Sequence, residues 1–429
     1  MSSTLAARRP RRNTTRDIST SDTENNDAKY TKEDDRPKQR WWTMSILLCI
    51  LLLLGAYYYE TYYVVSKNNS TTSIFQSESH NQQKKQISSS TPPNNNKEPS
   101  FVTIVMPSVV NYKERQRRLT AIAKTWGPTS HAIYVIHNLQ EEYPTPLNDG
   151  IHVLQVPSNI TFDDGLPRLY YVIRQIYENY EFDYAFFVND HTFVIPEHLC
   201  HYIRNSLNSH GSNVYVGHAL NNQEEAFNSG AAGYILSRPT IQNFIQALEA
   251  KDPNCIADGG NKWLQGNPGL VTARCFQRSL KAISTDTREA KKYHRFHAYG
   301  IVRMVMGKVD DWYRNKHAKL NDILPREFDS SYAQVLEGID CCSSETISFH
   351  YVESMEATAL YQIRKDLQTN PAMTDTELSN LVTKLWPNDY KLLGGYSRML
   401  PATKTEDWSN LLLVLRRIST SSLANKCHQ

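Results

Sequence analysis

The sequence predicts an α/β fold: a mostly parallel sheet flanked by helices, preceded by a single transmembrane helix and a disordered stem. Three observations lead to this expectation. From residue 101 onward, β-branched and aromatic runs alternate with stretches of helical periodicity, which is typical of parallel strands joined by crossover helices. A long uncharged apolar run occupies residues 41–59. The segment 64–100 between them is too polar to form a core.

Composition limits the class of protein. The 429 residues allow one large domain with appendages or two domains. A net charge of +3 is too small to indicate a nucleic-acid-binding protein, so we expect no nucleic acid as a partner. Six of the 7 cysteines follow the apolar run, which fits an oxidising lumen where disulfides persist. The sequence alone does not give their pairing.

The amino-terminal part predicts a membrane anchor. Residues 1–40 are polar and charged and should form a disordered cytosolic tail. We assign 41–63 as a signal-anchor, because its apolar run approaches the roughly 20 residues that span a bilayer and carries Trp and Tyr at its ends. Basic residues before Trp41 predict a single-pass type II topology with the remainder in the lumen. No small-residue cleavage site follows the run, which argues against a signal peptide.

Residues 64–100 predict a flexible lumenal stem, since Ser, Asn, Gln, Thr and Lys dominate them. Sequons begin at Asn68 and Asn69 in the stem and at Asn159 in the following domain. These three asparagines are candidates for glycosylation in a secretory compartment.

The domain that follows begins with the strand Phe101–Met106. Apolar residues at helical spacing predict helices over Glu114–Trp126 and Leu166–Tyr180. Other short apolar runs predict four further strands, and Pro196 opens another helix. These elements are the strands His131–His137, Ile151–Val156, Tyr184–Val188 and Val214–Val216, and the helix Pro196–Leu207.

The stretch Tyr184–Ile195 is the centre of the functional prediction. Its apolar strand runs directly into Asn189, Asp190 and His191. Ligands of open α/β sheets gather at the carboxyl ends of strands, so these side chains are well placed to hold a metal or a polar ligand. A surface turn that carries an aspartate explains the same residues equally well.

A glycine-rich block, Ser229–Ser237, contains Gly230 and Gly233. Such small residues allow a backbone to approach a ligand or another strand closely. From the residues alone, close packing of a strand and a helix is the favoured interpretation.

Several stretches, taken in order, resemble the family-31 glycosyltransferases, the β1,3-galactosyltransferase and Fringe-like group. The resemblance is greatest to the core 1 branch, which builds on O-linked GalNAc, and it covers about residues 100–365. Its most specific part joins Cys341-Cys342-Ser343 to Ser348–Val352. The other stretches are Lys124-Thr125-Trp126, Phe186–Ile195, Ser229–Ser237 and the segment from Asp286 to His297.

The resemblance implies a GT-A-like domain over 101–365, with 366–429 as a C-terminal extension. It implies a transferase that uses a UDP-sugar and Mn²⁺ and inverts the anomeric centre. UDP-galactose or another UDP-hexose would be the donor, and a glycoprotein or glycan the acceptor. Such an enzyme belongs on the Golgi membrane, or that of the endoplasmic reticulum. A homodimer is left open.

The same resemblance implies metal ligands. The family usually has three aspartates where Asn189-Asp190-His191 stand here. Asp190 keeps the middle position, and His191 replaces a carboxylate with a softer imidazole that can still bind Mn²⁺. His350 matches the family's metal-binding histidine. We therefore expect Asp190, His191 and His350 as metal ligands. The implied nucleotide-sugar contacts are Asn189, Asp190, Gly230, Gly233 and Tyr234.

The expected general base is missing from its usual place. The family commonly has an acidic pair where Pro268 and Gly269 stand, and no carboxylate lies between 262 and 274. An acceptor hydroxyl needs a group that takes its proton. Asp258 is our candidate, with Asp252 and Asp286 also near in sequence.

Two functions follow from these residues. The first is a transferase that adds galactose to an O-glycan. The second is an inactive chaperone or glycan-binding protein, because the usual acidic residues are altered. The resemblance also implies a Cys255–Cys275 disulfide. We expect Cys341 and Cys342 in disulfides, because their spacing to His350 fits no common zinc pattern.

Overall fold

The protein is described by a computed structural model, and all described residues lie in the unit that begins at Asn94. The predicted tail 1–40 and signal-anchor 41–63 fall outside the described residues, as does the predicted stem up to residue 98. No helix among the described residues is both long and apolar enough to cross a bilayer. The described ranges are 99–108, 111–136, 151–207, 213–222, 225–256, 268–307, 335–386 and 405–419.

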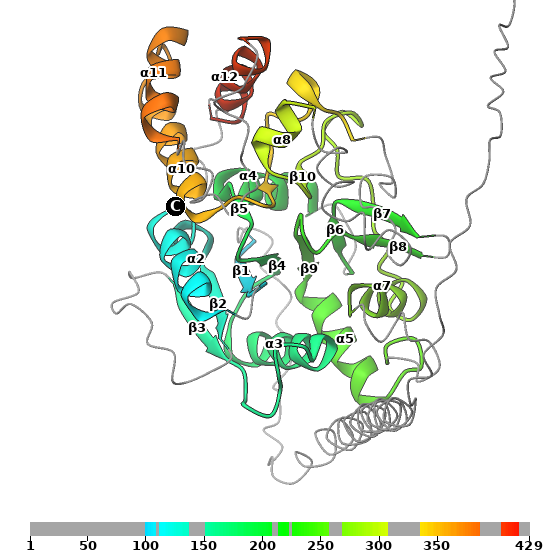
Figure 1. Cartoon of the computed structure of the whole chain (residues 1–429). Helices are drawn as coiled ribbons and strands as arrows, with labels where there is room; N and C mark the ends of the chain where they lie inside the picture. The colour runs from blue at the N-terminus through cyan, green and yellow to red at the C-terminus, as the bar shows by residue number, and fades with distance from the viewer. Residues whose placement is uncertain are drawn as a thin grey trace, which may run out of the picture. The chain divides into compact units, whose positions relative to one another are not determined.

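A six-stranded sheet forms the centre of this unit (Figure 1). Its strands are β1 (Phe101–Met106), β2 (Ala132–Ile136), β3 (His152–Gln155), β4 (Tyr184–Asn189), β6 (Tyr215–Gly217) and β9 (Tyr234–Ser237). They lie in the order β3-β2-β1-β4-β9-β6. The first four of these run parallel, and β9 runs antiparallel to both β4 and β6. The expected mostly parallel sheet is confirmed.

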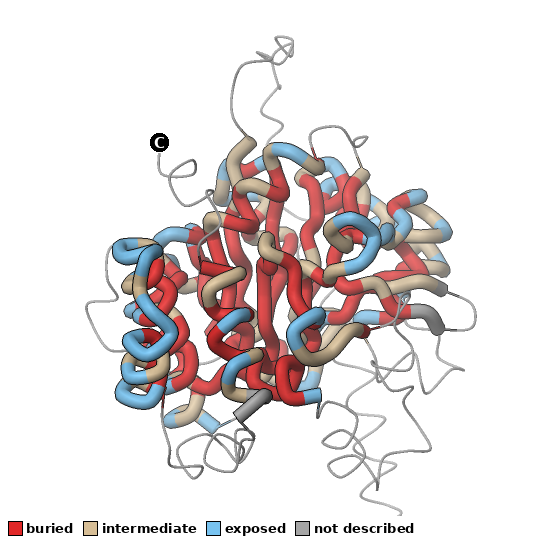
Figure 2. The backbone as a smooth tube through the Cα atoms, turned by 90° about the horizontal axis from the view of Figure 1, so that it is seen from above, coloured by how far each residue is buried: buried red, intermediate tan, exposed pale blue. Residues whose placement is uncertain are grey.

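Both faces of the sheet are buried, which explains the continuous apolar runs of its strands. In β4, residues 184, 186 and 188 enter one hydrophobic cluster, and 185 and 187 enter the other. Helix α2 (Tyr112–Lys124) covers the first face. The second face is covered by α3 (Gly165–Asn179), α5 (Arg238–Glu249) and α7 (Pro268–Arg278). Buried backbone accordingly fills the centre of the view in Figure 2, and exposed turns lie around it.

A small second sheet brings distant segments to the end of β4. It consists of β10 (Phe296–His297), β11 (Ser348–Phe349) and β5 (Phe193–Val194), with β11 parallel to β10 and antiparallel to β5. The amide of Val352 donates to the carbonyl of His191 at 3.0 Å. The His350 segment is thereby fixed beside the turn that follows β4.

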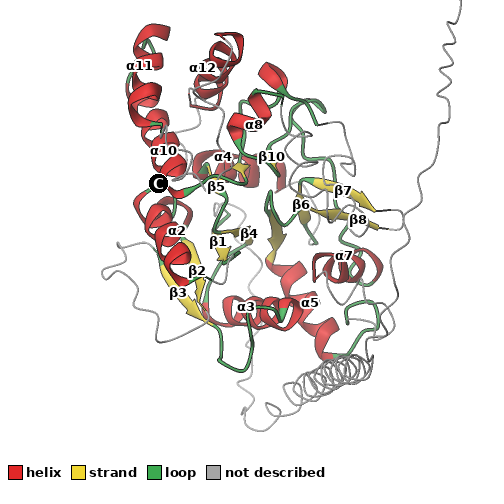
Figure 3. Ribbon diagram, viewed as in Figure 1, coloured by secondary structure: helices red, strands yellow, loops and turns green. Residues whose placement is uncertain are grey.

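The remaining elements complete the unit (Figure 3). The predicted helix Pro196–Leu207 is α4 (Pro196–Tyr202) continued by a π-helical turn, Ile203–Leu207. Helix α10 (Ser354–Thr369) runs through residue 365, where we placed the domain boundary, and α12 (Thr405–Ser419) joins the same hydrophobic cluster as the first sheet face. The other elements are the hairpin β7 (Ala219–Asn222) and β8 (Glu225–Asn228), and the helices α8 (Ile301–Val305), α10 (Ser354–Thr369), α11 (Asp375–Leu385) and α12 (Thr405–Ser419).

Two disulfides link described cysteines. Cys255 is joined to Cys275 on α7, as the resemblance implied, and Cys341 is joined to its neighbour Cys342. The side chain of Arg274 reinforces the first link by donating to the carbonyls of Asn254 and Ile256, at 3.0 and 2.7 Å.

We expect the double variant Cys255→Ala/Cys275→Ala to lose about 3 kcal/mol of unfolding free energy, because its loop of 20 residues is no longer closed in the unfolded chain. Cys341→Ala/Cys342→Ala is the matched control, since it also removes two buried sulfurs but opens no long loop. Urea unfolding of the purified chain measures both. Equal losses would contradict the loop-closure explanation.

Buried histidines surround the small sheet. The Nδ1 of His198 lies 2.7 Å from the carbonyl oxygen of Thr346, so Nδ1 must carry the proton and donate it. Burial, followed by the charge of Arg364, lowers the pKa of His198 to about 4. Burial beside His294 lowers the pKa of His218 to about 3. Both side chains are therefore neutral in the folded protein at physiological pH.

These histidines make stability depend on pH. As the pH falls below 6.5, His198 becomes protonated in the unfolded chain, but in the folded chain it stays neutral until about pH 4. The unfolded chain therefore binds more protons over this window, and we expect the unfolding free energy to decrease as the pH falls through it. His198→Asn removes one such group and should flatten the slope by up to about 1.4 kcal/mol per pH unit. Urea unfolding at several pH values checks this expectation. An identical slope in the variant would contradict it.

Candidate functional site

The site lies in the turn that follows β4. The Oδ1 of Asn189 accepts from the amide of His191 at 2.9 Å and from the hydroxyl of Thr192 at 3.2 Å. The Thr192 hydroxyl also lies 3.2 Å from the carbonyl oxygen of Ala231. Asn189 therefore shapes the turn, and Thr192 attaches it to the glycine-rich block.

Asp190 is held in a buried network of protein groups. Its Oδ1 accepts from the hydroxyl of Ser108 at 2.6 Å, from the amide of Ser108 at 3.1 Å and from Arg118 Nη1 at 3.1 Å. The hydroxyl of Tyr134 lies 3.3 Å from its Oδ2. The Asp190 side chain is fully buried and that of Arg118 is 5% exposed. A buried charge requires such partners, and Arg118 supplies the compensating one.

Arg118 extends this network to a second carboxylate. Its Nε donates to Glu114 Oε1 at 3.2 Å, one turn earlier on α2. The guanidinium of Arg117 contacts the other oxygen of Glu114. The position of Glu114 is thus tied, through Arg118, to Asp190.

Glu114, His191 and Glu353 form a group with metal-ligand character. One ligand atom from each lies within 4.8 Å of the other two, and no other such group occurs in the described part of the chain. His191 Nε2 stands 3.1 Å from Glu353 Oε1. Burial raises the pKa of Glu353, but contact with His191 and the charge of Arg118 outweigh it and leave that pKa below its ordinary value. The Glu353 carboxylate is therefore ionised at neutral pH.

His350 lies beside His191, and the metal-ligand role of both stays a prediction. Their ring centroids are 6.0 Å apart in an edge-on arrangement, and His350 is buried. Its Nδ1 is 3.4 Å from the hydroxyl of Thr192. Tyr351, next along the chain, has a left-handed φ of 55°. The structure brings His191 and His350 together, while the Asp190 carboxylate contacts Ser108, Arg118 and Tyr134.

The glycine-rich block packs against β4. Gly233 has a φ of +87°, and a Cβ there would lie 2.7 Å from Phe186 and 2.8 Å from Val188. The ring of Tyr234 stacks on Phe187 at 5.4 Å. Gly230 is exposed with open space beside it. Close packing accounts for Gly233, and the nucleotide-sugar role of these residues stays a prediction.

The candidate base, Asp258, lies outside the described residues. Of its two alternatives, Asp252 accepts from the amide of Asn254 at 2.8 Å. Asp286 is bound by Arg288 through both oxygens, and this contact lowers its pKa.

Of the glycosylation candidates, Asn159 is exposed between β3 and α3. Asn68 and Asn69 lie outside the described residues.

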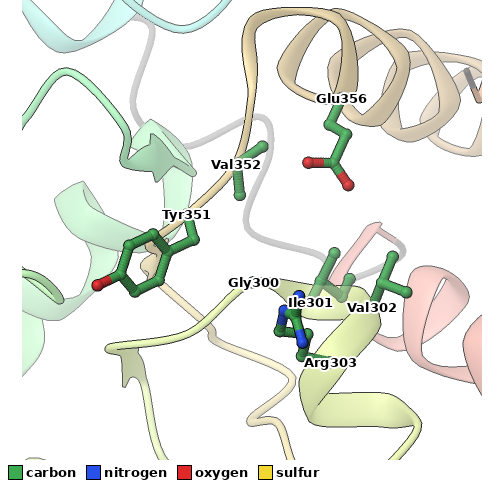
Figure 4. A pocket seen from close by; sticks show the side chains of 7 residues that line it. All are labelled: Gly300, Ile301, Val302, Arg303, Tyr351, Val352 and Glu356. Atoms are coloured by element: carbon green, nitrogen blue, oxygen red, sulfur yellow. The ribbon is translucent and has the colours of Figure 1, made fainter. Parts of the chain in front are cut away.

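A pocket adjoins the site between α8 and the start of α10 (Figure 4). Its wall includes Tyr351, which follows His350, and the buried side chains of Arg303 and Glu356. The other lining residues are Gly300, Ile301, Val302 and Val352.

Sequence reasoning missed Glu114, Arg118 and Glu353. Two arginines on the inward face of α2, Arg115 and Arg118, were a usable signal, since a charged residue in an apolar stripe needs a buried partner. Glu353 follows the His350 block directly and could have been singled out as a carboxylate near a suspected ligand.

Comparisons with known proteins give a distant relationship. No family model matches the chain. Glycoprotein-N-acetylgalactosamine 3-beta-galactosyltransferase 1 of Xenopus laevis is 24% identical over 190 residues, which is 43% of this chain and 46% of that protein. The chain thus matches less than half the length of this relative. The similarity supports a relationship to a galactosyltransferase.

Among solved structures, S. aureus TarS 1–349 is 13% identical, with coverage of 73% of this chain and 89% of the other. The TM-score of 0.27 is too low for this likeness to support a conclusion.

We expect Arg118→Met to lower the unfolding free energy by about 3–5 kcal/mol, because it leaves the buried Asp190 carboxylate without its compensating charge. Arg174→Met is the control, since its exposed pair with Glu178 is worth about 0–1 kcal/mol. Urea unfolding measures both. Adding Asp190→Asn to Arg118→Met should recover part of the loss, and equal effects of the two arginine variants would contradict the network.

Proposed function

We propose that the protein is a glycosyltransferase that moves a hexose from a UDP-sugar to O-linked GalNAc or a similar glycan on glycoproteins. Galactose, transferred with inversion into a β1,3 linkage, is the expected reaction. The observation that carries this proposal is the sequence similarity to a galactosyltransferase. The polar turn after β4 supports it, because strand ends of parallel sheets are where α/β proteins bind ligands.

Mn²⁺ or another divalent cation fits this proposal. A bound cation would neutralise the charge that develops on the leaving diphosphate. Two carboxylates and one imidazole converge at Glu114, His191 and Glu353, and oxygen and imidazole donors suit such cations. The buried Asp190 network keeps α2 and the β4 turn in a fixed relation, which orients these donors.

The proton of the acceptor hydroxyl requires a base, and we propose Asp258 for this role. The proposal also includes a type II anchor at residues 41–63 in the Golgi or endoplasmic reticulum membrane. The polar tail before it and the cysteines after it support that orientation.

A second candidate function is an inactive chaperone or glycan-binding protein. The specific observation in its favour is the use of Asp190, the one aspartate kept from the family motif, in a network of protein side chains. The helix α7 also begins at Pro268, where the family has acidic residues.

We expect the purified full chain, supplied with Mn²⁺ and UDP-galactose, to release UDP and to add a hexose to a peptide bearing O-linked GalNAc. Mass spectrometry of the peptide and a UDP assay measure the two products. The same peptide without GalNAc is the control. If a folded chain transfers no sugar from any UDP-hexose yet binds the glycopeptide, the binding-protein function replaces the transferase.

A further inference from the structure

We propose that Asn159 carries an N-linked oligosaccharide that shields the open edge of the main sheet at β3. The sequon Asn159-Ile160-Thr161 marks the attachment point, and the structure supplies the place and the role. The proposal rests on the lumenal orientation included in the proposed function, but it requires no transferase activity of this chain.

Asn159 occupies the tip of a firmly held turn. The amide of Ile160 donates to the carbonyl of Pro157 at 3.0 Å and closes this turn. Val156 and Ile160 are buried on either side of the tip, whereas Asn159 is exposed. An oligosaccharide joined to the Asn159 side chain can therefore extend into solvent without displacing core residues.

The fold uses the rest of the sequon for itself. Asp164 Oδ2 accepts from the amide of Thr161 at 2.8 Å and from its hydroxyl at 2.7 Å. By contrast, the Asn159 side chain makes no hydrogen bond to another described residue. If the oligosaccharide is added while the chain is still unfolded, these bonds can form afterwards and leave the sugar outside the domain.

The turn directly follows an edge strand. β3 ends the strand order of the main sheet, and among the described strands it pairs only with β2 (Figure 1). The amide of Val156 donates to the carbonyl of Ile136 at 2.8 Å, so the chain stays attached to the sheet up to the residue before the turn. A glycan on Asn159 therefore begins beside the unpaired side of β3.

Such an edge needs protection. It presents backbone amides and carbonyls that can pair with a strand of another copy of the chain. Lysine and proline commonly prevent this pairing, yet the four residues of β3, His152–Gln155, include neither. A bulky, hydrated oligosaccharide at the end of the strand supplies the missing protection.

The first test measures occupancy in the full chain, produced with a carboxyl-terminal tag in cells that have a secretory pathway. Enzymatic release of N-glycans converts the carrying asparagine to aspartate, and mass spectrometry locates this change on a peptide. We expect the conversion at Asn159 in the wild type. It should persist in Thr161→Ser, the matched control that keeps the sequon, and disappear in Thr161→Ala, which lacks it. Protease protection of the tag in sealed microsomes measures the orientation separately.

The second test measures assembly by sedimentation. Release of the glycan from the folded wild type, and the variant Asn159→Gln, should both produce larger species than the glycosylated chain. Adding His152→Lys to Asn159→Gln should reverse this association, because a charge on β3 opposes pairing between edges. Thermal unfolding checks that each variant is folded.

Every outcome supports or overturns the proposal. Modification of Asn159 together with association after its loss supports it. An unmodified Asn159 in a chain whose tag is protected overturns the site and leaves the lumenal orientation standing. An accessible tag overturns both. A glycan whose removal leaves sedimentation unchanged, apart from the lost mass, overturns the shielding role.

Discussion

The buried ion pair between Asp190 and Arg118 is the constraint on which the site depends. It joins the ends of β1 and β4 to α2, and Tyr134 adds β2 to the same network. Removing Arg118 would leave the buried Asp190 carboxylate without its contacting cation, and breaking a buried pair in this way costs several kcal/mol. Once paired, the two residues fix the rotation of α2 about its axis. That rotation determines where the Glu114 side chain lies. The ion pair in the core therefore sets the position of Glu114 relative to His191 and Glu353.

The sequence was most informative where structure is local. Runs such as Phe101–Met106 and Tyr184–Val188 identified buried strands because residues on both faces must be apolar. Helical spacing placed α2 and α3 to within about two residues, since each helix buries one continuous stripe. The disulfide at Cys255 followed from the resemblance and is present.

The rest depends on contacts between distant residues. The antiparallel insertion of β9 between β4 and β6 was not foreseen, because a short run such as Tyr234–Ser237 does not reveal its direction. The partners of Asp190 were harder to find, since Ser108 belongs to no motif and the place of Arg118 in the apolar stripe of α2 predicts a buried partner without naming it. The resemblance drew attention to His191 and His350, yet the carboxylates that converge on His191 belong to Glu114 on α2 and to Glu353, the residue before α10.

The separation of Glu114 and Glu353 along the chain has a consequence for biosynthesis. The main sheet and α2 are complete in the chain well before α10 is translated. Contacts of high sequence separation form late, because their loop-closure entropy must be overcome first. A nascent chain that stops before residue 353 would contain the Asp190 network but only two of the three converging side chains. This group is therefore completed only after the segment that precedes α10 has been made and has docked against the turn after β4.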